Sequence, residues 1–141
     1  MEAHPETVEV CVEVTRGGRV KRRPDGSIDF VSPFASPFSY GSVTGRLAAD
    51  GDPEDALILG APIDVGTMVR RKVWGRVVFE DAGVPDHKWV CSTELPTETE
   101  WMTIEKFFRR YVWAKRALYV LRWKTGRVNF VGLERFSNRL A

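Results

Sequence analysis

The sequence predicts a mainly β, α+β fold in which short strands close, or nearly close, into a barrel and one main helix packs against it. Several segments alternate apolar and polar residues over a few positions and are bounded by glycine, proline or aspartate turns. A helical period appears as a main element only after Pro96. Because strands and helices do not alternate along the chain, a parallel α/β sheet is excluded.

Length and composition are those of one compact domain covering residues 1–141. The content of 43% hydrophobic residues, with five tryptophans, is enough to close a core. The net charge of +2 gives no global attraction to nucleic acid or membrane, so any charge-based function must come from local clusters.

The chain has none of the marks of secretion or membrane insertion. The first ten residues carry Glu2, Glu6 and Glu9 instead of a basic and then apolar segment. The longest apolar run, residues 56–63, is too short to span a bilayer. Cys11 and Cys91 lack metal or redox spacing, so we expect free thiols in the reducing cytoplasm and no membrane partner.

The first half of the chain predicts strands separated by turns. Residues 8–14 alternate valine with Glu9, Cys11 and Glu13, the period of a half-buried strand. Pro24, Asp25 and Gly26 make a turn, which predicts a hairpin that returns through residues 28–31. A structured loop follows over residues 32–39, and strand signals resume at residues 40–47.

The second half contains two acidic loops, then the main helix. Residues 56–59, 68–79 and 87–91 have strand character. Thr97 and Glu100 have capping-box spacing, and the stripe that follows comprises Trp101, Ile104, Phe108 and Tyr111. Beyond the helix we expect a strand over residues 117–131, broken by a turn at 124–126, and a short C-terminal helix over residues 134–140.

The two acidic loops carry the chemistry. Asp50, Asp52 and Asp55 lie within six residues, and Asp81 and Asp86 follow in the second loop. Crowded carboxylates repel one another unless cations are present, and hard divalent ions such as Mg²⁺ take carboxylate and water ligands while leaving positions for phosphate.

Acidic turns are commonly solvated and inert, and this interpretation suffices for the first loop alone. Two acidic loops together with Lys21 and Lys88 weaken it. Lys88 is expected on the same strand face as Asp86, with His87 pointing the other way.

The segment of residues 37–60, PFSYGSVTGRLAADGDPEDALILG, resembles the active-site stretch of the family I soluble inorganic pyrophosphatases. That family's motif is Asp-Gly-Asp-Pro-apolar-Asp after a Tyr-Gly strand. Further pieces recur at family-like spacing: Glu13 with Lys21, Gly66, Asp81 with Asp86 and Lys88, and Phe107 and Phe108 before Tyr111. One position, Glu54, is usually apolar in the family.

The resemblance implies an OB-like barrel that binds several Mg²⁺ ions, with Mn²⁺ or Zn²⁺ as substitutes, and activates a water to attack pyrophosphate. It assigns the metal ligands to Asp50, Asp55, Asp81 and Asp86, with Glu13 reaching a metal through water. It makes Asp52 the general base and gives phosphate contacts to Lys21, Tyr40, Lys88 and Tyr111. It also implies a homo-oligomer, commonly a hexamer in bacteria.

This chain departs from the family pattern at several positions. Where the family has Lys-Tyr-Glu, the chain has Lys21, Arg22 and Arg23; Phe30 replaces an arginine, Ser36 a tyrosine and Val112 a lysine. Charged hydrogen bonds contribute roughly 1.5 to 3 kcal/mol each, so losing two cations costs about two to four powers of ten in transition-state binding.

Three accounts of these substitutions remain. Arg22 or Arg23 replaces a lost cation and pyrophosphate is still cleaved. Alternatively, Phe30 and Val112 form an apolar wall and the substrate becomes an organic diphosphate or another metabolite. In the third account the barrel binds a metal or nucleotide without turnover. We favour the first narrowly over the second.

A nucleic-acid-binding barrel is the alternative from another class, because OB-like barrels bind single strands through basic grooves with stacking aromatics. The candidate surface comprises Arg19, Lys21, Arg22, Arg23, Arg70, Arg71, Lys72 and Trp74. We do not expect this function, since the five aspartates would repel a phosphate backbone and basic residues commonly protect strand edges.

Overall fold

The computed structural model describes residues 4–22, 25–31, 34–49, 51–81, 83–121 and 128–136, with the side chains of 29–30 and 117–121 excepted. Two predicted site residues, Asp50 and Arg23, lie outside the described residues, and so does the side chain of Phe30.

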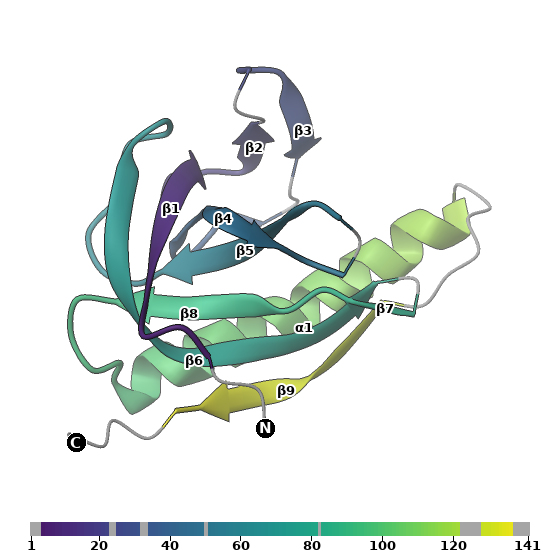
Figure 1. The fold of residues 1–141 in the computed structure, drawn as a ribbon. Coiled ribbons are helices and arrows are strands. Elements are labelled where there is room, and N and C mark those ends of the chain that lie inside the picture. Colours follow the sequence, from purple (N-terminus) through teal and green to yellow (C-terminus); the bar gives the residue numbers. More distant parts are fainter. Residues whose placement is uncertain are drawn as a thin grey trace.

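Five strands form a closed barrel (Figure 1). They are, in spatial order, β1 (Thr7–Val14), β4 (Ser39–Leu47), β5 (Pro53–Ile58), β8 (Lys88–Ser92) and β6 (Met68–Asp81). The ring closes because β1 also pairs with β6. The β5–β8 pair is parallel and the other pairs are antiparallel. The barrel predicted from the sequence is therefore confirmed.

Smaller strands extend this barrel. The strand β9 (Val128–Arg135) lies antiparallel along β6, and β7 (Val84–Pro85) pairs with the end of β6. The hairpin of β2 (Val20–Arg22) and β3 (Ile28–Val31) forms a separate two-stranded sheet above the barrel (Figure 1). This hairpin is the one that the turn at residues 24–26 predicts.

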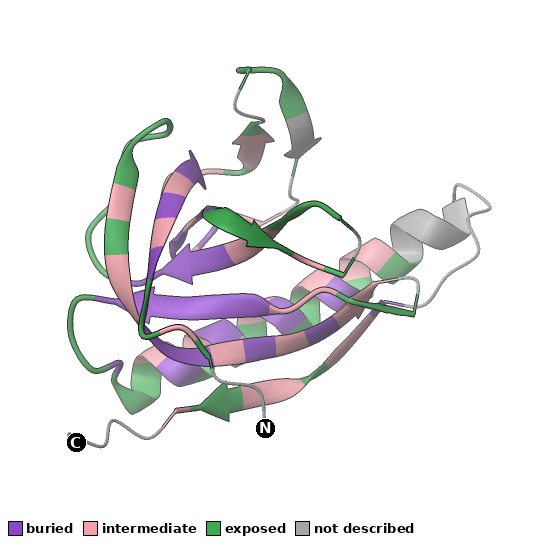
Figure 2. Ribbon diagram, viewed as in Figure 1, coloured by how far each residue is buried: buried purple, intermediate pink, exposed green. Residues whose placement is uncertain are grey.

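The strand β8 is buried along its whole length, whereas β4 is exposed toward its end (Figure 2). The buried residues form two apolar clusters. Alternation along a strand divides the residues: Ala56 and Ile58 of β5 pack with β1 residues, while Leu57 between them packs toward the helix. At Gly41 of β4, a Cβ would lie 2.0 Å from the carbonyl oxygen of Cys11, so only glycine lets β1 and β4 approach this closely.

The helix α1 (Glu98–Leu121) begins as the sequence predicts. Its capping box is formed: the Thr97 backbone N–H donates to Glu100 Oε1 at 3.0 Å, and the Glu100 N–H donates to Thr97 Oγ1 at 3.1 Å. Trp101, Ile104 and Phe108 are buried against the sheet. Figure 1 shows the helix lying along one side of the barrel.

The C-terminal predictions need two corrections. Residues 117–121 continue α1, and of the expected strand over 117–131 the described residues show the part from Val128 onward, in β9. The expected turn at 124–126 lies outside the described residues. Extending an existing helix adds one hydrogen bond per residue without a new nucleus, and this outweighs the β preference of the local sequence. Glu134 and Arg135 lie in β9, not in a short helix, and residues 137–140 lie outside the described part of the chain.

In the described ranges, no helix combines the length and apolarity needed to cross a membrane. The two cysteines are both free, Cys11 being half-buried and Cys91 buried. Burial raises the pKa of the Cys91 thiol to about 12.

This difference between the thiols predicts selective labelling. At pH 8 the native protein should react with one equivalent of a thiol reagent, at Cys11, because Cys91 is 0% exposed and its raised pKa suppresses the reactive thiolate. In denaturant two equivalents should react. Spectrophotometric titration with Cys11→Ser as the control measures this, and rapid reaction of two thiols in the native protein would contradict it.

Candidate functional site

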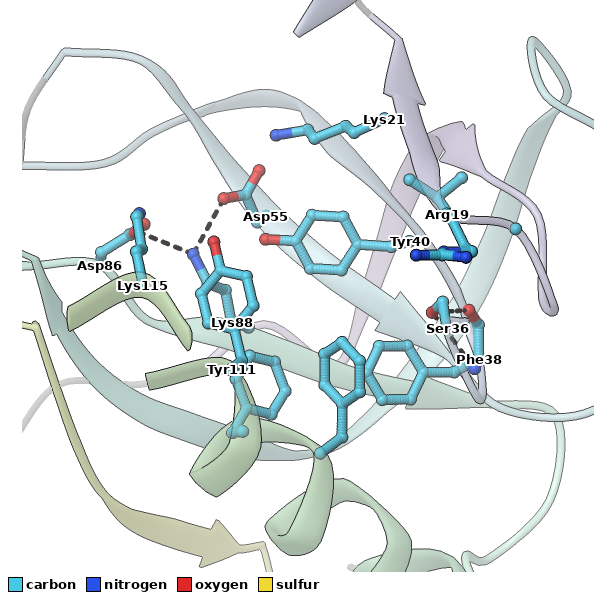
Figure 3. Close-up of a pocket in the computed structure, with 14 residues that line it drawn as sticks. Arg19, Lys21, Ser36, Phe38, Tyr40, Asp55, Asp86, Lys88, Tyr111 and Lys115 are labelled. Atoms are coloured by element: carbon cyan, nitrogen blue, oxygen red, sulfur yellow. Dashed lines mark hydrogen bonds and ion pairs between the residues drawn. The ribbon is translucent and has the colours of Figure 1, made fainter. Parts of the chain in front are cut away.

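A cavity of about 270 Å³ opens between the barrel, the base of the β2–β3 hairpin and α1 (Figure 3). It combines charged, phenolic and aromatic side chains. Its lining residues are Val14, Gly18, Arg19, Lys21, Ser36, Phe38, Tyr40, Asp55, Asp86, Lys88, Phe107, Phe108, Tyr111 and Lys115. Six of these, namely Lys21, Tyr40, Asp55, Asp86, Lys88 and Tyr111, are among the catalytic and metal-binding residues that the sequence predicts.

Two carboxylates meet one ammonium at the centre of the cavity. Lys88 Nζ lies 3.1 Å from Asp55 Oδ2 and 2.8 Å from Asp86 Oδ2 (Figure 3). Asp55 and Lys88 are directly paired in the parallel register of β5 and β8. Lys88 is 5% exposed, so its charge is compensated by these two carboxylates in a largely desolvated setting.

The neighbours of Lys88 point to different sides, as the sequence predicts, although Asp86 and His87 lie just before β8 and not within it. Asp86 faces the cavity with Lys88, whereas His87 lies on the other face, where its Nδ1 accepts a hydrogen bond from the Phe79 backbone N–H at 3.2 Å. A histidine adjacent to the acidic site therefore takes no part in it.

Two phenols line the cavity from opposite sides, Tyr40 from β4 and Tyr111 from α1 (Figure 3). Burial raises the pKa of Tyr40 well above its ordinary value, and the negative charges of Asp55 and Asp86 raise it further. Burial also raises the pKa of Tyr111. Both phenols therefore stay protonated at neutral pH and are able to donate hydrogen bonds to an anion.

Glu13 and Lys21 lie close to each other at one end of the site. Glu13 is 7% exposed, and its Oε1 lies 3.9 Å from Lys21 Nζ. The Lys21 ammonium also lies 5.5 Å from the centre of the Tyr40 ring. Glu13 and Lys21, which the resemblance assigns to one site, are therefore close together in the fold.

The remaining predicted ligands lie differently. Asp81, the last residue of β6, forms an ion pair with Lys115 of α1, with Nζ 2.5 Å from Oδ2. Asp52 lies on an exposed turn before β5 and is not among the lining residues of the cavity. Within the part of the chain that the structure describes, no group of three His, Cys, Asp or Glu side chains is placed to hold a metal ion.

The substituted positions divide between the cavity and its surroundings. Ser36 lines the cavity and its hydroxyl donates to the Phe38 carbonyl at 2.5 Å. Arg22 is exposed and donates to the Gly26 carbonyl of its own hairpin at 2.9 Å. Val112 is 6% exposed in the core between helix and sheet, so it does not contribute to an apolar cavity wall, contrary to the second account above.

Two cations in the cavity were not predicted as replacements in the site, Arg19 and Lys115. Each has a periodic signal that identifies it in retrospect. Arg19 precedes Lys21 by two residues, the spacing of one strand face, and Lys115 follows Tyr111 by four, the spacing of one helix face. Neither residue occupies a position of the family motif, so the resemblance does not assign it to the site.

The unusual Glu54 has a structural explanation outside the cavity. It points away from Asp55, and its Oε1 accepts hydrogen bonds from Arg46 Nε at 2.5 Å and from Trp89 Nε1 at 3.1 Å. The substitution of an apolar residue by glutamate therefore serves packing on the opposite face of β5 and leaves the site unchanged.

The surface considered for nucleic acid lacks its stacking group. Trp74 is 6% exposed, and its Nε1 donates to the Ser92 carbonyl at 3.0 Å. Lys72 lies over the Trp74 ring at 4.5 Å, and Arg70 lies 3.8 Å from Glu9. Since Trp74 belongs to the core, it offers no face to a base.

Comparison with known sequences agrees with the site. A family model described as inorganic pyrophosphatase matches residues 10–126. The chain is 36% identical over 95 residues to the inorganic pyrophosphatase of Gluconobacter oxydans (strain 621H), covering 62% of this chain and 55% of that protein. It is 39% identical over 92 residues to that of Thermus thermophilus, covering 60% and 53% respectively. The chain thus spans about half the length of these curated relatives.

Solved structures agree with the fold. An inorganic pyrophosphatase from Coxiella burnetii superposes with a TM-score of 0.74 at 24% identity, covering 96% of this chain and 90% of that chain. The Thermus thermophilus structure gives 0.71 at 25% identity, covering 96% and 86%. The OB-like character of the barrel is confirmed by these neighbours.

Proposed function

Because the chain belongs to the inorganic pyrophosphatase family, we propose that it hydrolyses inorganic pyrophosphate to phosphate with Mg²⁺ as cofactor. The observation that carries this proposal is the meeting of Asp55 and Asp86 around one cation, beside two protonated phenols, in a cavity of about 270 Å³. This volume lies just below the usual range for small-molecule sites, about 300 to 1,000 Å³, and suits a compact anion.

The described residues fit a hard divalent ion in their donor chemistry. Asp55 and Asp86 already direct oxygen atoms at a common positive charge, the Lys88 ammonium, and carboxylate oxygen is the donor that Mg²⁺ prefers. We propose these two residues as ligands, together with Asp50 and Asp81 by resemblance, and Glu13 through water. A bound ion supplies a hydroxide near neutral pH and neutralises charge on the departing phosphate.

The cavity's other groups fit the substrate. Lys21 and Lys88 provide ammonium groups, and Tyr40 and Tyr111 provide O–H donors, which suit the oxygens of a diphosphate. Fixed donors of this kind stabilise charge that develops during the reaction, because they need no reorganisation.

An organic diphosphate is the second candidate substrate, and one feature of the cavity favours it. Phe38, Phe107 and Phe108 line the cavity beside the charged groups. Such a surface would hold an apolar or aromatic leaving group more readily than a second phosphate.

Phosphate release from pyrophosphate, with and without Mg²⁺, tests the proposal, and organic diphosphates are assayed in parallel. Rapid Mg²⁺-dependent release from pyrophosphate supports the proposed function. Release from an organic diphosphate alone would transfer the proposal to the second substrate class. No release from either would refute hydrolysis by this chain.

The role of Asp52 is a separate prediction. If Asp52 is the general base, Asp52→Asn should lower turnover by about 10²- to 10⁴-fold, the usual contribution of such a group. Mg²⁺ affinity by calorimetry and the melting temperature should stay close to wild type, since Asp52 is exposed and lines no part of the cavity. An active Asp52→Asn enzyme would remove the assignment.

We also propose a cytoplasmic homo-oligomer, a hexamer by resemblance to bacterial family members. Large apolar side chains at the surface support an interface: Trp113 on α1 is 74% exposed and Met102 is 53% exposed. Light scattering coupled to gel filtration measures the mass of the assembly, and a monomer at assay concentration would contradict this proposal.

A further inference from the structure

We propose that Lys115 is a phosphate-binding residue of this chain and supplies the cation that the family places directly after the tyrosine at position 111. This inference rests on the proposed function for the identity of the anion. It names a residue that lies outside the family motif and that the resemblance does not assign.

The orientation of the helix explains why the cation occupies a new position. Val112 is 6% exposed and packs in the core with Ile104 and Phe108, so that position faces the sheet. Lys115 follows Tyr111 by four residues, about one helical turn, and the two side chains share a helix face. Both line the cavity (Figure 3). In this chain the turn after Tyr111, not the adjacent residue, presents a charge to the site.

The surroundings of Lys115 hold its ammonium at the cavity. Its Nζ lies 2.5 Å from Asp81 Oδ2 and 5.6 Å from the centre of the Tyr111 ring. The side chain is 18% exposed and reaches the cavity from the end opposite Arg19 (Figure 3). A lysine stem has four carbons and rotatable bonds, so a small movement of Nζ transfers a hydrogen bond from Asp81 to an anion.

The charge balance of the cavity supports anion binding. Four cations line it, Arg19, Lys21, Lys88 and Lys115, and two carboxylates, Asp55 and Asp86, while Glu13 and Asp81 lie against Lys21 and Lys115 from outside the lining. Lys88 is held by both of the lining carboxylates, whereas the ion pair of Lys115 is with Asp81, which is not among the lining residues. An anion in the cavity therefore competes with Asp81 for Lys115.

A purely structural role is the competing interpretation, in which the Lys115–Asp81 pair only ties α1 to the end of β6. The two roles predict different effects of Asp81→Asn on anion binding in metal-free buffer. A structural tie predicts equal destabilisation by Lys115→Gln and Asp81→Asn and no change in anion binding. A phosphate-binding role predicts opposite effects, because Asp81→Asn releases Lys115 from its competitor while Lys115→Gln removes the charge.

The test is calorimetric titration with imidodiphosphate, a non-hydrolysable analogue of pyrophosphate, in metal-free buffer. We expect Lys115→Gln to weaken binding by about 10- to 100-fold, the range for a hydrogen bond to a charged group. Lys115→Arg should restore most of the affinity and Asp81→Asn should increase it. Lys106→Gln, which removes an exposed lysine of the same helix, should bind like wild type.

The outcome separates this inference from the proposed function. Unchanged imidodiphosphate binding by Lys115→Gln, or no binding by the wild type, would overturn the inference. A wild type that still releases phosphate from pyrophosphate would then leave the proposed function intact. Conversely, Lys115→Gln could bind imidodiphosphate more weakly than the wild type while the wild type hydrolyses no pyrophosphate. That result would uphold the inference and reject the proposed function.

Discussion

Asp55→Asn should lower the rate of pyrophosphate hydrolysis by at least about a hundredfold and weaken Mg²⁺ binding together with it. Asp55 lies at the centre of the cavity, where its Oδ2 is 3.1 Å from Lys88 Nζ. Burial is the main cause of the raised pKa of Tyr40, and the charge of Asp55 and its hydrogen bond with Tyr40 raise this pKa further. A bound metal supplies several kcal/mol of charge stabilisation, and each 1.4 kcal/mol, roughly, is a factor of ten in rate. Removing one of two central carboxylates therefore affects both the metal and the chemistry.

The matched control is Glu54→Gln, which neutralises the adjacent carboxylate of β5. Glu54 faces away from the cavity, where it accepts hydrogen bonds from Arg46 and Trp89. It should lose stability, not Mg²⁺ affinity, because its partners lie outside the site. Steady-state assays, Mg²⁺ titration calorimetry and melting curves on both variants measure this. Equal Mg²⁺ affinity in Asp55→Asn and wild type would contradict the role assigned to Asp55.

The comparison of Asp55 with Glu54 shows what the sequence makes predictable. The period of two along a strand places neighbouring carboxylates on opposite faces, and the same rule placed Asp86 and Lys88 together and His87 apart. The start of α1 was equally predictable, because a capping box is a local signal between Thr97 and Glu100. Features that depend on neighbouring residues in the chain are read correctly from the sequence.

Other features depend on contacts distant in the chain. The ion pair between Asp81 and Lys115 joins residues 34 positions apart, and nothing local to either residue indicates it. The end of α1 was misplaced for a related reason: Arg116 on the extended helix donates from Nε to the Val128 carbonyl of β9 at 2.9 Å, a tertiary contact that favours helix over strand. Here packing overrides local propensity.

Helix orientation is the third such feature, and it leads to the largest expected loss of stability. Motif comparison identifies Val112 as the position of a family lysine, but only the structure shows that it faces the core. Val112→Lys should therefore destabilise the fold by about 3 kcal/mol or more at neutral pH, since it would bury an ammonium among apolar side chains. Chemical denaturation at constant pH measures the free energy of unfolding.

Val131→Lys in β9 is the control, because it makes the same valine-to-lysine change where the side chain is 63% exposed. Its effect on the free energy of unfolding should lie within about 0.5 kcal/mol of zero.

The destabilisation by Val112→Lys should depend on pH. Burial would lower the pKa of a lysine at position 112, so the unfolded state would bind more protons than the folded state. The loss of unfolding free energy should therefore shrink as pH rises toward the pKa of lysine in the unfolded chain, about 10.4.

A stable Val112→Lys protein would show that position 112 can turn its side chain out of the core and toward the cavity. The family cation would then be recoverable at its usual position, and the reason for a shift to Lys115 would disappear. A destabilised protein would show instead that the register of α1 against the sheet excludes a cation at 112. Lys115, on the cavity face one turn after Tyr111, is then the position from which α1 supplies the cation.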